Sequence, residues 1–401
     1  MSPRREGVPL HIRNSQSIIR KRLSLYIHIP FCVKKCAYCD FASSADSGIP
    51  LDEYGAGVIR EMELRAASLG GSMTAETLYL GGGTPSLLPP ELVARFVRTA
   101  VECYGLVPDG EITLEANPGT VTGESLAGFR AAGANRISLG IQSFDDRMLA
   151  TLGRVHTARE AVDAVAGARS AGFDNLSLDL IHSLPGQTPD AWREELRQGV
   201  ALGPEHISAY GLTLEEGTPL QRLWEVGGVA LPDEEAGALM FRMTTDILGE
   251  AGYEQYEISS FARPGRRSRH NQVYWRRDPY LGFGAAAHSF LATPSFGRRW
   301  HNPHDPLEYL HFLAAGGLPP EGCGELSRED AMAETFFLGL RTTDGVDMER
   351  FRETFGESVG EVYGPEIESL LATGLLQRRG SRLAIPVPLL ILSNQIIVKF
   401  V

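Results

Sequence analysis

The sequence has few cysteines, five in 401 residues, and an odd number of cysteines cannot all pair within one chain. Three of them, Cys32, Cys36 and Cys39, lie within eight consecutive residues. A secreted domain held together by disulfides spaces its cysteines differently, so the clustering predicts metal ligation in a reducing, cytoplasmic compartment. Cys103 and Cys323 stand alone, and we interpret both as packing residues.

Long apolar runs and an excess of positive charge are also absent. No stretch of about 18 or more apolar residues occurs, so no transmembrane helix is predicted, although peripheral membrane contact stays open. The net charge is −12, whereas nucleic-acid binding needs a basic face that neutralises phosphates. The exception is residues 1–22, which are basic but have no apolar segment like that of a secretory signal. We interpret them as a basic tail, with a transit peptide or a basic arm as alternatives.

The first half of the chain alternates between strand-like and helix-like segments. Apolar runs typical of strands are Leu25–Ile29, Thr77–Leu80, Glu111–Glu115, Arg136–Ile141, Asn175–Ile181 and His206–Leu212. Apolar stripes with helical period lie between them, such as Tyr54, Val58 and Met62. Strands that alternate with helices predict parallel βαβ units, and six units predict an α/β fold with a partial (β/α)6 barrel.

The pattern changes after about residue 230. One helix is expected over residues 234–252, and further helices with a short strand pair around Leu375–Leu383 predict a smaller, mostly helical, winged-helix-like C-terminal domain. The apolar stretch Pro386–Val401 is interpreted as a buried strand and a terminal helix. The predicted organisation is a tail (1–22), a partial barrel (23–230), a segment that covers the barrel (231–320) and the helical C-terminal domain (321–401).

Residues with functional chemistry follow the expected strands, where parallel α/β folds bind their ligands. The residues at these strand ends are Cys32, Gly81–Gly83, Glu115, Gln142 and Asp179. Because the carboxyl ends of parallel strands share one edge of a sheet, these residues are expected to form one site.

The cysteines have the spacing CxxxCxxC. Three thiolates on a short loop can each bind a different iron of a 4Fe–4S cubane, which leaves the fourth iron open for chemistry. The alternative is a structural zinc site, which needs a fourth ligand. Asp40 and His28 are candidates for it, but neither lies at the usual zinc spacing.

This loop, with Gly81-Gly82-Gly83-Thr84-Pro85 after the second strand, resembles the radical SAM superfamily. The resemblance implies that the fourth iron binds S-adenosylmethionine, which an electron from the reduced cluster can cleave to a 5′-deoxyadenosyl radical. It also implies a set of residues that contact S-adenosylmethionine: Tyr26, Gly82, Gly83, Thr84, Glu115, Gln142, Arg154 and Asp179.

From about Ser24 to Val401 the chain resembles the oxygen-independent coproporphyrinogen III oxidase-like group, which contains the oxidase and the HemW-type heme chaperones. The oxidase has a further cysteine where this chain has Phe41, and an N-terminal extension where only 31 residues precede Cys32. The chaperones carry an HNxxYW motif, which corresponds to His270-Asn271-Gln272-Val273-Tyr274-Trp275. The resemblance therefore favours the chaperones.

The chaperone branch implies heme as a further ligand, with His270 binding its iron and with apo-proteins of the respiratory chain as recipients. Imidazole is a common ligand of heme iron, and aromatic rings pack on a porphyrin face. An electron donor is implied if S-adenosylmethionine is cleaved, but no catalytic residue is assigned and enzymatic activity stays open. The alternatives are the decarboxylating oxidase and a purely structural iron–sulfur or zinc protein.

Two short segments depart from the pattern of the group. The usual Tyr-Gly before Leu-Pro-Gly-Gln is His182-Ser183 here, and the usual Gly-Pro-Gly-Ala-His is Gly284-Ala285-Ala286-Ala287-His288. Loss of glycine and proline is expected to alter the backbone of these loops. His182 and His288 are alternative heme ligands to His270.

Overall fold

The computed structural model describes residues 21–45, 48–70, 73–293 and 295–401, without the side chains of Lys21 and Cys323. The predicted basic tail (1–22) therefore lies almost entirely outside the described residues, and so does the packing role predicted for Cys323. No helix in the described ranges is long and apolar enough to cross a membrane.

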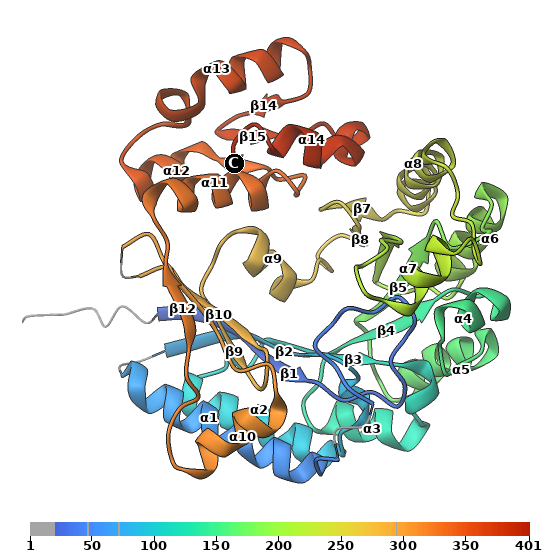
Figure 1. The fold of residues 1–401 in the computed structure, drawn as a ribbon, viewed down its shortest axis with the longest axis vertical. Coiled ribbons are helices and arrows are strands. Elements are labelled where there is room, and N and C mark those ends of the chain that lie inside the picture. The colour runs from blue at the N-terminus through green and yellow to red at the C-terminus, as the bar shows by residue number, and fades with distance from the viewer. Residues whose placement is uncertain (1–20, 46–47, 71–72, 294) are drawn as a thin grey trace, which may run out of the picture.

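Six parallel strands form the centre of the molecule, which confirms the predicted α/β core. They are β1 (Lys21–Ile29), β2 (Met73–Gly82), β3 (Glu111–Ala116), β4 (Arg136–Gln142), β5 (Leu176–His182) and β6 (His206–Gly211). Each strand pairs in parallel with the next along the chain. This order places all six carboxyl ends along one rim of a curved sheet (Figure 1).

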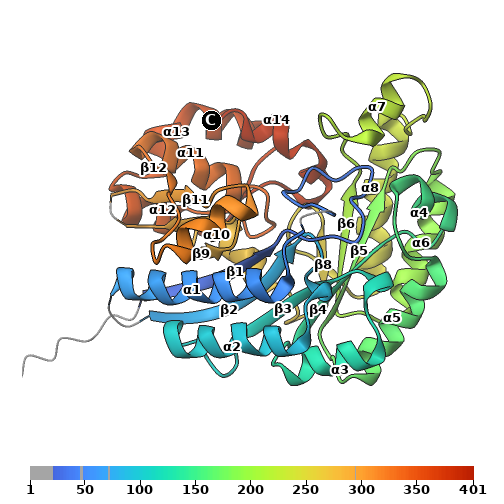
Figure 2. The ribbon, with the colours of Figure 1, turned by 60° about the horizontal axis from the view of Figure 1, so that its bottom comes forward.

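Helices connect these strands and cover the outer face of the sheet (Figure 2). They are α1 (Leu51–Leu69), α2 (Pro90–Tyr104), α3 (Gly123–Ala131), α4 (Asp146–Leu152), α5 (Ala158–Ser170) and α6 (Pro189–Ala201), with the short turns η1 (Pro85–Leu87) and η2 (Pro118–Thr120). Local sequence sets their ends. Thr157 and Glu160 form a reciprocal capping box at the start of α5, and α2 ends at Gly105 in the left-handed conformation.

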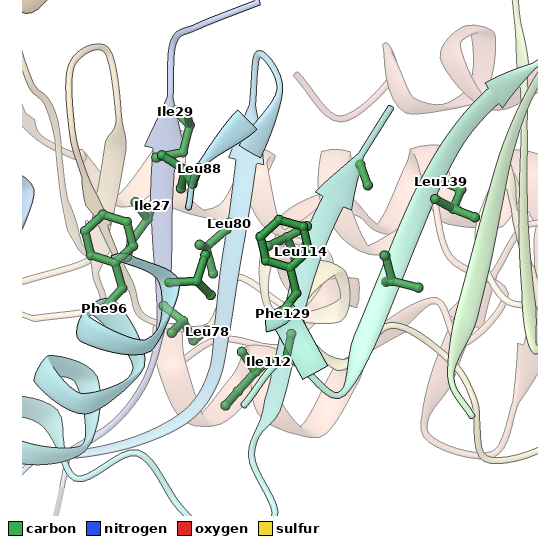
Figure 3. Packing of buried hydrophobic residues seen from close by; sticks show 14 of the residues in the cluster. Ile27, Ile29, Leu78, Leu80, Leu88, Phe96, Ile112, Leu114, Phe129 and Leu139 are labelled. Atoms are coloured by element: carbon green, nitrogen blue, oxygen red, sulfur yellow. The ribbon is translucent and has the colours of Figure 1, made fainter. Parts of the chain in front are cut away.

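The main hydrophobic core lies between the strands and these helices (Figure 3). Ile27, Leu80 and Leu114 on neighbouring strands are fully buried, and Phe96 of α2 and Phe129 of α3 pack against them. Each such side chain contributes about 1.5–3 kcal/mol by leaving water. This core fixes the strands whose ends carry the site.

Residues after β6 extend the sheet at both edges. The sequence predicted that residues 231–320 cover the barrel, but it did not predict that they add strands to the sheet. After α7 (Pro219–Glu225) and α8 (Glu234–Glu250), β7 (Glu254–Gln255) and β8 (Ser260–Ala262) continue the sheet beyond β6. At the other edge β9 (Tyr280–Phe283) pairs in parallel with β1. It is followed by β10 (His288–Leu291), β11 (Arg298–His301) and β12 (Gly322–Glu325), with α10 (Pro306–Ala314) between the last two.

The C-terminal part has a hydrophobic core of its own. Its helices are α11 (Arg328–Gly339), α12 (Met348–Phe355) and α13 (Val359–Ala372), and its small antiparallel sheet contains β13 (Val346–Asp347), β14 (Gln377–Arg379) and β15 (Arg382–Ala384). Helices with a small antiparallel sheet agree with the predicted C-terminal domain. Helix α9 (Arg269–Trp275) lies between this domain and the inner face of the central sheet (Figure 1).

The predicted strand in Pro386–Val401 is wrong. The chain forms a 3-10 turn, η3 (Val387–Leu392), followed by the short helix α14 (Ser393–Ile397). Pro386 and Pro388 have no backbone N–H for a strand ladder, and a short apolar run alone does not distinguish a strand from a buried helix.

Candidate functional site

The cysteine loop follows β1 at the rim of the sheet and is held by backbone hydrogen bonds to neighbouring elements. The N–H of Ala37 donates to the carbonyl of Leu152 at the end of α4 (2.9 Å), and the carbonyl of Ala37 accepts from the N–H of Leu220 in α7 (2.9 Å). Cys32, Cys36 and Cys39 are free thiols that are partly exposed. The loop is therefore clamped from two sides, with its sulfurs open to a ligand.

The arrangement of the thiols bears on the choice between zinc and a cluster. Across the described part of the chain, no three His, Cys, Asp or Glu side chains are placed to hold a single metal ion. A zinc site needs its ligands to converge on one ion, whereas a cubane takes each thiolate on a different iron. The residues therefore fit a 4Fe–4S cluster better than a zinc ion.

Two glycines, the last residue of β2 and the one after it, let the backbone approach the cysteines. The N–H of Gly83 donates to the carbonyl of Ile29 (2.8 Å), and a Cβ at Gly83 would lie 3.0 Å from the Cys32 sulfur. Gly82 has φ of +109°, and a Cβ there would meet the ring of His28 at 2.5 Å. Both positions therefore require glycine for space, and Gly82 also for its backbone conformation.

A cavity of about 390 Å³ joins the cysteine loop to the strand ends; we call it the cluster cavity. Its lining contains the three cysteines together with Gly82, Gly83, Thr84, Glu115, Gln142, Arg154 and Asp179. The structure thus brings these predicted contacts together at one rim. Tyr26 is the exception, because it does not line this cavity and lines two neighbouring pockets instead.

Arg154 connects the cavity to the cysteines. Its Nη1 donates to the Cys36 sulfur (3.4 Å) and its Nη2 to the carbonyl of Gly140 (2.8 Å). Its Nε is buried and has no hydrogen-bond partner among the described residues. A half-buried guanidinium with an unpartnered N–H suits an anionic ligand group such as the carboxylate of S-adenosylmethionine.

Two half-buried carboxyl groups also line the cavity. Glu115 accepts hydrogen bonds from the Tyr79 hydroxyl (2.7 Å) and the Gly82 N–H (3.2 Å), and burial raises its pKa to about 7. Asp179 accepts from the Ser138 hydroxyl (3.0 Å), and burial raises its pKa as well. An ammonium group or ribose hydroxyls placed here would offset the cost of burying these carboxylates.

Gln142 ends β4 in the left-handed region, with φ of +68°. This conformation costs a residue other than glycine roughly 1–2 kcal/mol, and such strain often accumulates at functional sites. Gln142 also interrupts the register between β4 and β5, and its side chain lines the cluster cavity.

Sequence reasoning missed several polar residues of the cavity, among them Tyr38, Asn117 and Tyr210. Asn117 directly follows β3 and is held by His156, whose Nδ1 lies 3.0 Å from its Oδ1. Tyr210 lies near the end of β6. Both occupy the strand ends at which functional residues were expected, so the same rule, applied to every strand, finds them.

Two further pockets adjoin the cluster cavity. The outer pocket, about 410 Å³, is lined by Tyr26, Phe41, Tyr274, Tyr280, His288 and His304 among others. The inner pocket, about 420 Å³, lies on the other side of Tyr26 and Tyr274 and contains His270, Trp275 and Arg341. Phe41, Gly82 and Glu115 border both the outer pocket and the cluster cavity, so these two spaces share a wall.

The three candidate heme ligands lie in different surroundings. His270 is buried, with Nδ1 2.7 Å from the Thr77 hydroxyl and Nε2 2.8 Å from the Tyr274 hydroxyl. His182 is buried against Trp192. His288 is exposed at the start of β10. The predicted role of His270 as a ligand would require the release of Tyr274 from Nε2 or of Thr77 from Nδ1.

Known families match two parts of the chain. Residues 26–198 match the radical SAM superfamily, and residues 326–386 match the HemN C-terminal domain. The fold is similar to that of coproporphyrinogen III oxidase from Escherichia coli, with a TM-score of 0.80 over 95% of this chain and 90% of that chain at 23% identity. At this identity, the likeness shows the fold alone.

Relatives with higher identity cover most of the chain. The heme chaperone HemW of Bacillus subtilis is 35% identical over 89% of this chain and 93% of its own length. The Haemophilus influenzae protein of the same name is 42% identical over 68% of this chain and 71% of its own length. The mitochondrial radical S-adenosyl methionine domain-containing protein 1 of Mus musculus is 35% identical over 88% and 82%. With this coverage and the cysteine site at its first strand end, the chain belongs to the HemW family of radical SAM proteins.

Proposed function

We propose that this protein is a heme chaperone, which binds heme beside a 4Fe–4S cluster and S-adenosylmethionine and passes the heme to apo-proteins. The observation that carries the proposal is the shared wall of Phe41, Gly82 and Glu115. It joins the cysteine-lined cavity to a pocket lined by aromatic and histidine side chains. The relatives that match most of the chain are named heme chaperones.

Within this proposal the residues of the cluster cavity have separate tasks. Cys32, Cys36 and Cys39 hold the cluster, and Gly82, Gly83 and Thr84 allow the backbone to approach S-adenosylmethionine. Arg154 faces its carboxylate, and Glu115, Gln142 and Asp179 face its ammonium group and ribose. When bound, the cluster and S-adenosylmethionine supply one-electron chemistry, for which an external electron donor is needed.

The outer pocket gives the heme an apolar wall and access to solvent. Tyr26, Tyr274 and Tyr280 offer rings to a porphyrin face, and Phe41, which is 62% exposed, lies where the oxidase has a cysteine. We propose a cytoplasmic location, with respiratory apo-proteins as recipients at the membrane surface. One of His270, His182 and His288 supplies the ligand to the heme iron.

The test combines two assays on the same anaerobically reconstituted protein. Heme titration followed by absorption should give a saturable, stoichiometric complex, and transfer to an apo-cytochrome should remove heme from it. An assay of coproporphyrinogen decarboxylation should give no product. Efficient decarboxylation would instead assign the oxidase activity, and a protein that binds no heme would refute the proposal.

A further inference from the structure

The three candidate histidines differ in whether a ring nitrogen is free to bind iron. Both nitrogens of His270 are engaged, with Thr77 at 2.7 Å and Tyr274 at 2.8 Å, and its side chain is buried. Ligation through Nε2 would leave the Tyr274 hydroxyl without this partner, and ligation through Nδ1 would do the same to Thr77. Either change loses a buried hydrogen bond, which costs about 1–3 kcal/mol.

His182 is also poorly placed. Its Nδ1 lies 2.9 Å from the Ser183 hydroxyl, and its buried ring packs 5.5 Å from that of Trp192. It does not line the outer pocket, the inner pocket or the cluster cavity. A porphyrin could reach it only if the surrounding core opened.

His288 lies on a rigid element and has an accessible ring. It pairs with His301 across β10 and β11, and the Gly284 N–H of the preceding loop donates to the buried Glu61 carboxylate (2.9 Å). Glu61 also accepts from the Asn302 side chain (2.8 Å), so α1 fixes the backbone on both sides of this histidine pair. The ring of His288 is exposed, and within the described ranges its nitrogens make no hydrogen bond.

The pocket beside His288 suits a porphyrin. Its volume of about 410 Å³ is within the usual range of ligand pockets, and Tyr26, Tyr274 and Tyr280 provide aromatic walls.

We infer that heme binds in the outer pocket with His288 as the ligand to its iron, while His270 remains hydrogen-bonded inside the barrel and orients Tyr274. This assignment rests on the proposed heme chaperone function and specifies the site within it. His304 is exposed and lines the same pocket.

The test is heme titration of His288→Ala, with His311→Ala as the matched control. His311 is an exposed histidine of α10 that does not line the outer pocket, so its loss reports non-specific binding by surface histidines. We expect His288→Ala to bind heme at least tenfold more weakly and to shift the Soret band, with an unchanged iron–sulfur spectrum. Added imidazole should restore the parent Soret band, and His311→Ala should behave like the parent.

The outcomes separate this assignment from the broader proposal. Parent-like heme affinity and Soret band in His288→Ala would overturn the His288 assignment alone. So would failure of imidazole to restore the band, because a vacated coordination position should accept it. A parent protein without any heme binding would overturn both.

Discussion

At the scale of single residues, the three cysteines are the least replaceable side chains of the site. Each thiolate binds a different iron of a 4Fe–4S cluster, so replacing one cysteine leaves an iron without its protein ligand. We expect Cys32→Ala, Cys36→Ala and Cys39→Ala each to lose the visible iron–sulfur absorption after reconstitution. Iron and sulfide analysis checks this, with Cys103→Ala as the control; full cluster content in any of the three variants would contradict it.

Arg154 is expected to influence both the cluster and its ligand. It donates to the Cys36 sulfur and lines the cluster cavity, and its Nε has no hydrogen-bond partner among the described residues. Arg154→Ala should weaken S-adenosylmethionine binding by about 1.5–3 kcal/mol, the range for a hydrogen bond to a charged group. It should also make the cluster potential more negative, because loss of the cation and its N–H destabilises the reduced cluster.

Two measurements on the Arg154→Ala protein check these effects separately. Equilibrium dialysis gives the affinity for S-adenosylmethionine, and a redox titration followed by electron paramagnetic resonance gives the potential without it. Arg147→Ala is a suitable control, because Arg147 is exposed and pairs with the nearby Asp145. Unchanged affinity and potential in Arg154→Ala would mean that its guanidinium serves the Gly140 backbone alone.

Glu115 should make stability depend on pH. Burial raises its pKa to about 7 in the folded chain, above the ordinary glutamate value near 4.3. A raised carboxyl pKa means that the folded state holds the proton more tightly, so stability falls as pH rises from about 4.3 to 7 and then levels off. The loss is on the order of 3 kcal/mol above pH 7.

Glu115→Gln removes this titration and provides the measurement. Urea unfolding of both proteins without S-adenosylmethionine, at pH values from 5 to 8, should show the variant gaining stability relative to the parent as pH rises. Parallel curves would show that Glu115 does not titrate in this range. S-adenosylmethionine should bind the parent more tightly above pH 7 than at pH 6, because its ammonium group prefers the carboxylate.

At the scale of elements, the loop between β9 and β10 carries avoidable strain. Ala286 has φ of +59° in a segment where the group usually has glycine, and Ser183 has φ of +60° at the other departure. We expect Ala286→Gly to stabilise the protein by about 0.5–1 kcal/mol, because relief of the left-handed penalty exceeds the entropic cost of glycine. Chemical denaturation measures this effect, with Ala292→Gly, outside the left-handed region, as a destabilising comparison; a less stable Ala286→Gly would contradict the reasoning.

The elements that could be predicted were those with a strong local pattern. The runs around Ile27, Leu80 and Ile207 and the stripe of Tyr54, Val58 and Met62 reflect the burial periodicity of strands and helices, and the structure confirms them. The strands β9 to β12 were not predicted, since their order depends on the pairing of β9 with β1, more than 250 residues earlier in the chain. Local patterns carry no information about such a pairing.

The same limit applies to the site. Cys32, Gly83 and Glu115 could be predicted because they follow strands at motif spacings, and the cavity brings them together. The surroundings of His270 could not, because its partners Thr77 and Tyr274 depend on how α9 packs against β2. A motif identifies which residue stands at a position. Whether a ring nitrogen of that histidine is free to bind iron depends on the packed structure.

At the scale of the whole molecule, an ion pair links the extended sheet to the C-terminal domain. Arg277 precedes β9, and its Nε donates to Glu334 of α11 at 2.6 Å, with both side chains largely buried. We expect Arg277→Ala to destabilise the protein by about 2 kcal/mol, less than for a buried pair left without any partner, because Arg299 remains beside Glu334.

Differential scanning calorimetry of Arg277→Ala checks this expectation. The parent has two hydrophobic cores, so weakening their connection should separate the unfolding of the C-terminal domain from that of the barrel. Arg60→Ala, which removes an exposed pair with Glu63, should leave the profile unchanged. A single, unshifted transition in Arg277→Ala would show that this pair does not couple the two parts.

The shared wall of Phe41, Gly82 and Glu115 has a thermodynamic consequence. S-adenosylmethionine that moves these residues from the cluster cavity changes the affinity of the outer pocket for heme by some factor. Thermodynamic reciprocity then requires heme to change the affinity for S-adenosylmethionine by the same factor. If S-adenosylmethionine tightens heme binding fivefold, heme must tighten S-adenosylmethionine binding fivefold, which is about 1 kcal/mol of coupling. Heme delivery to a recipient would then weaken S-adenosylmethionine binding, so that release at one site prepares release at the other.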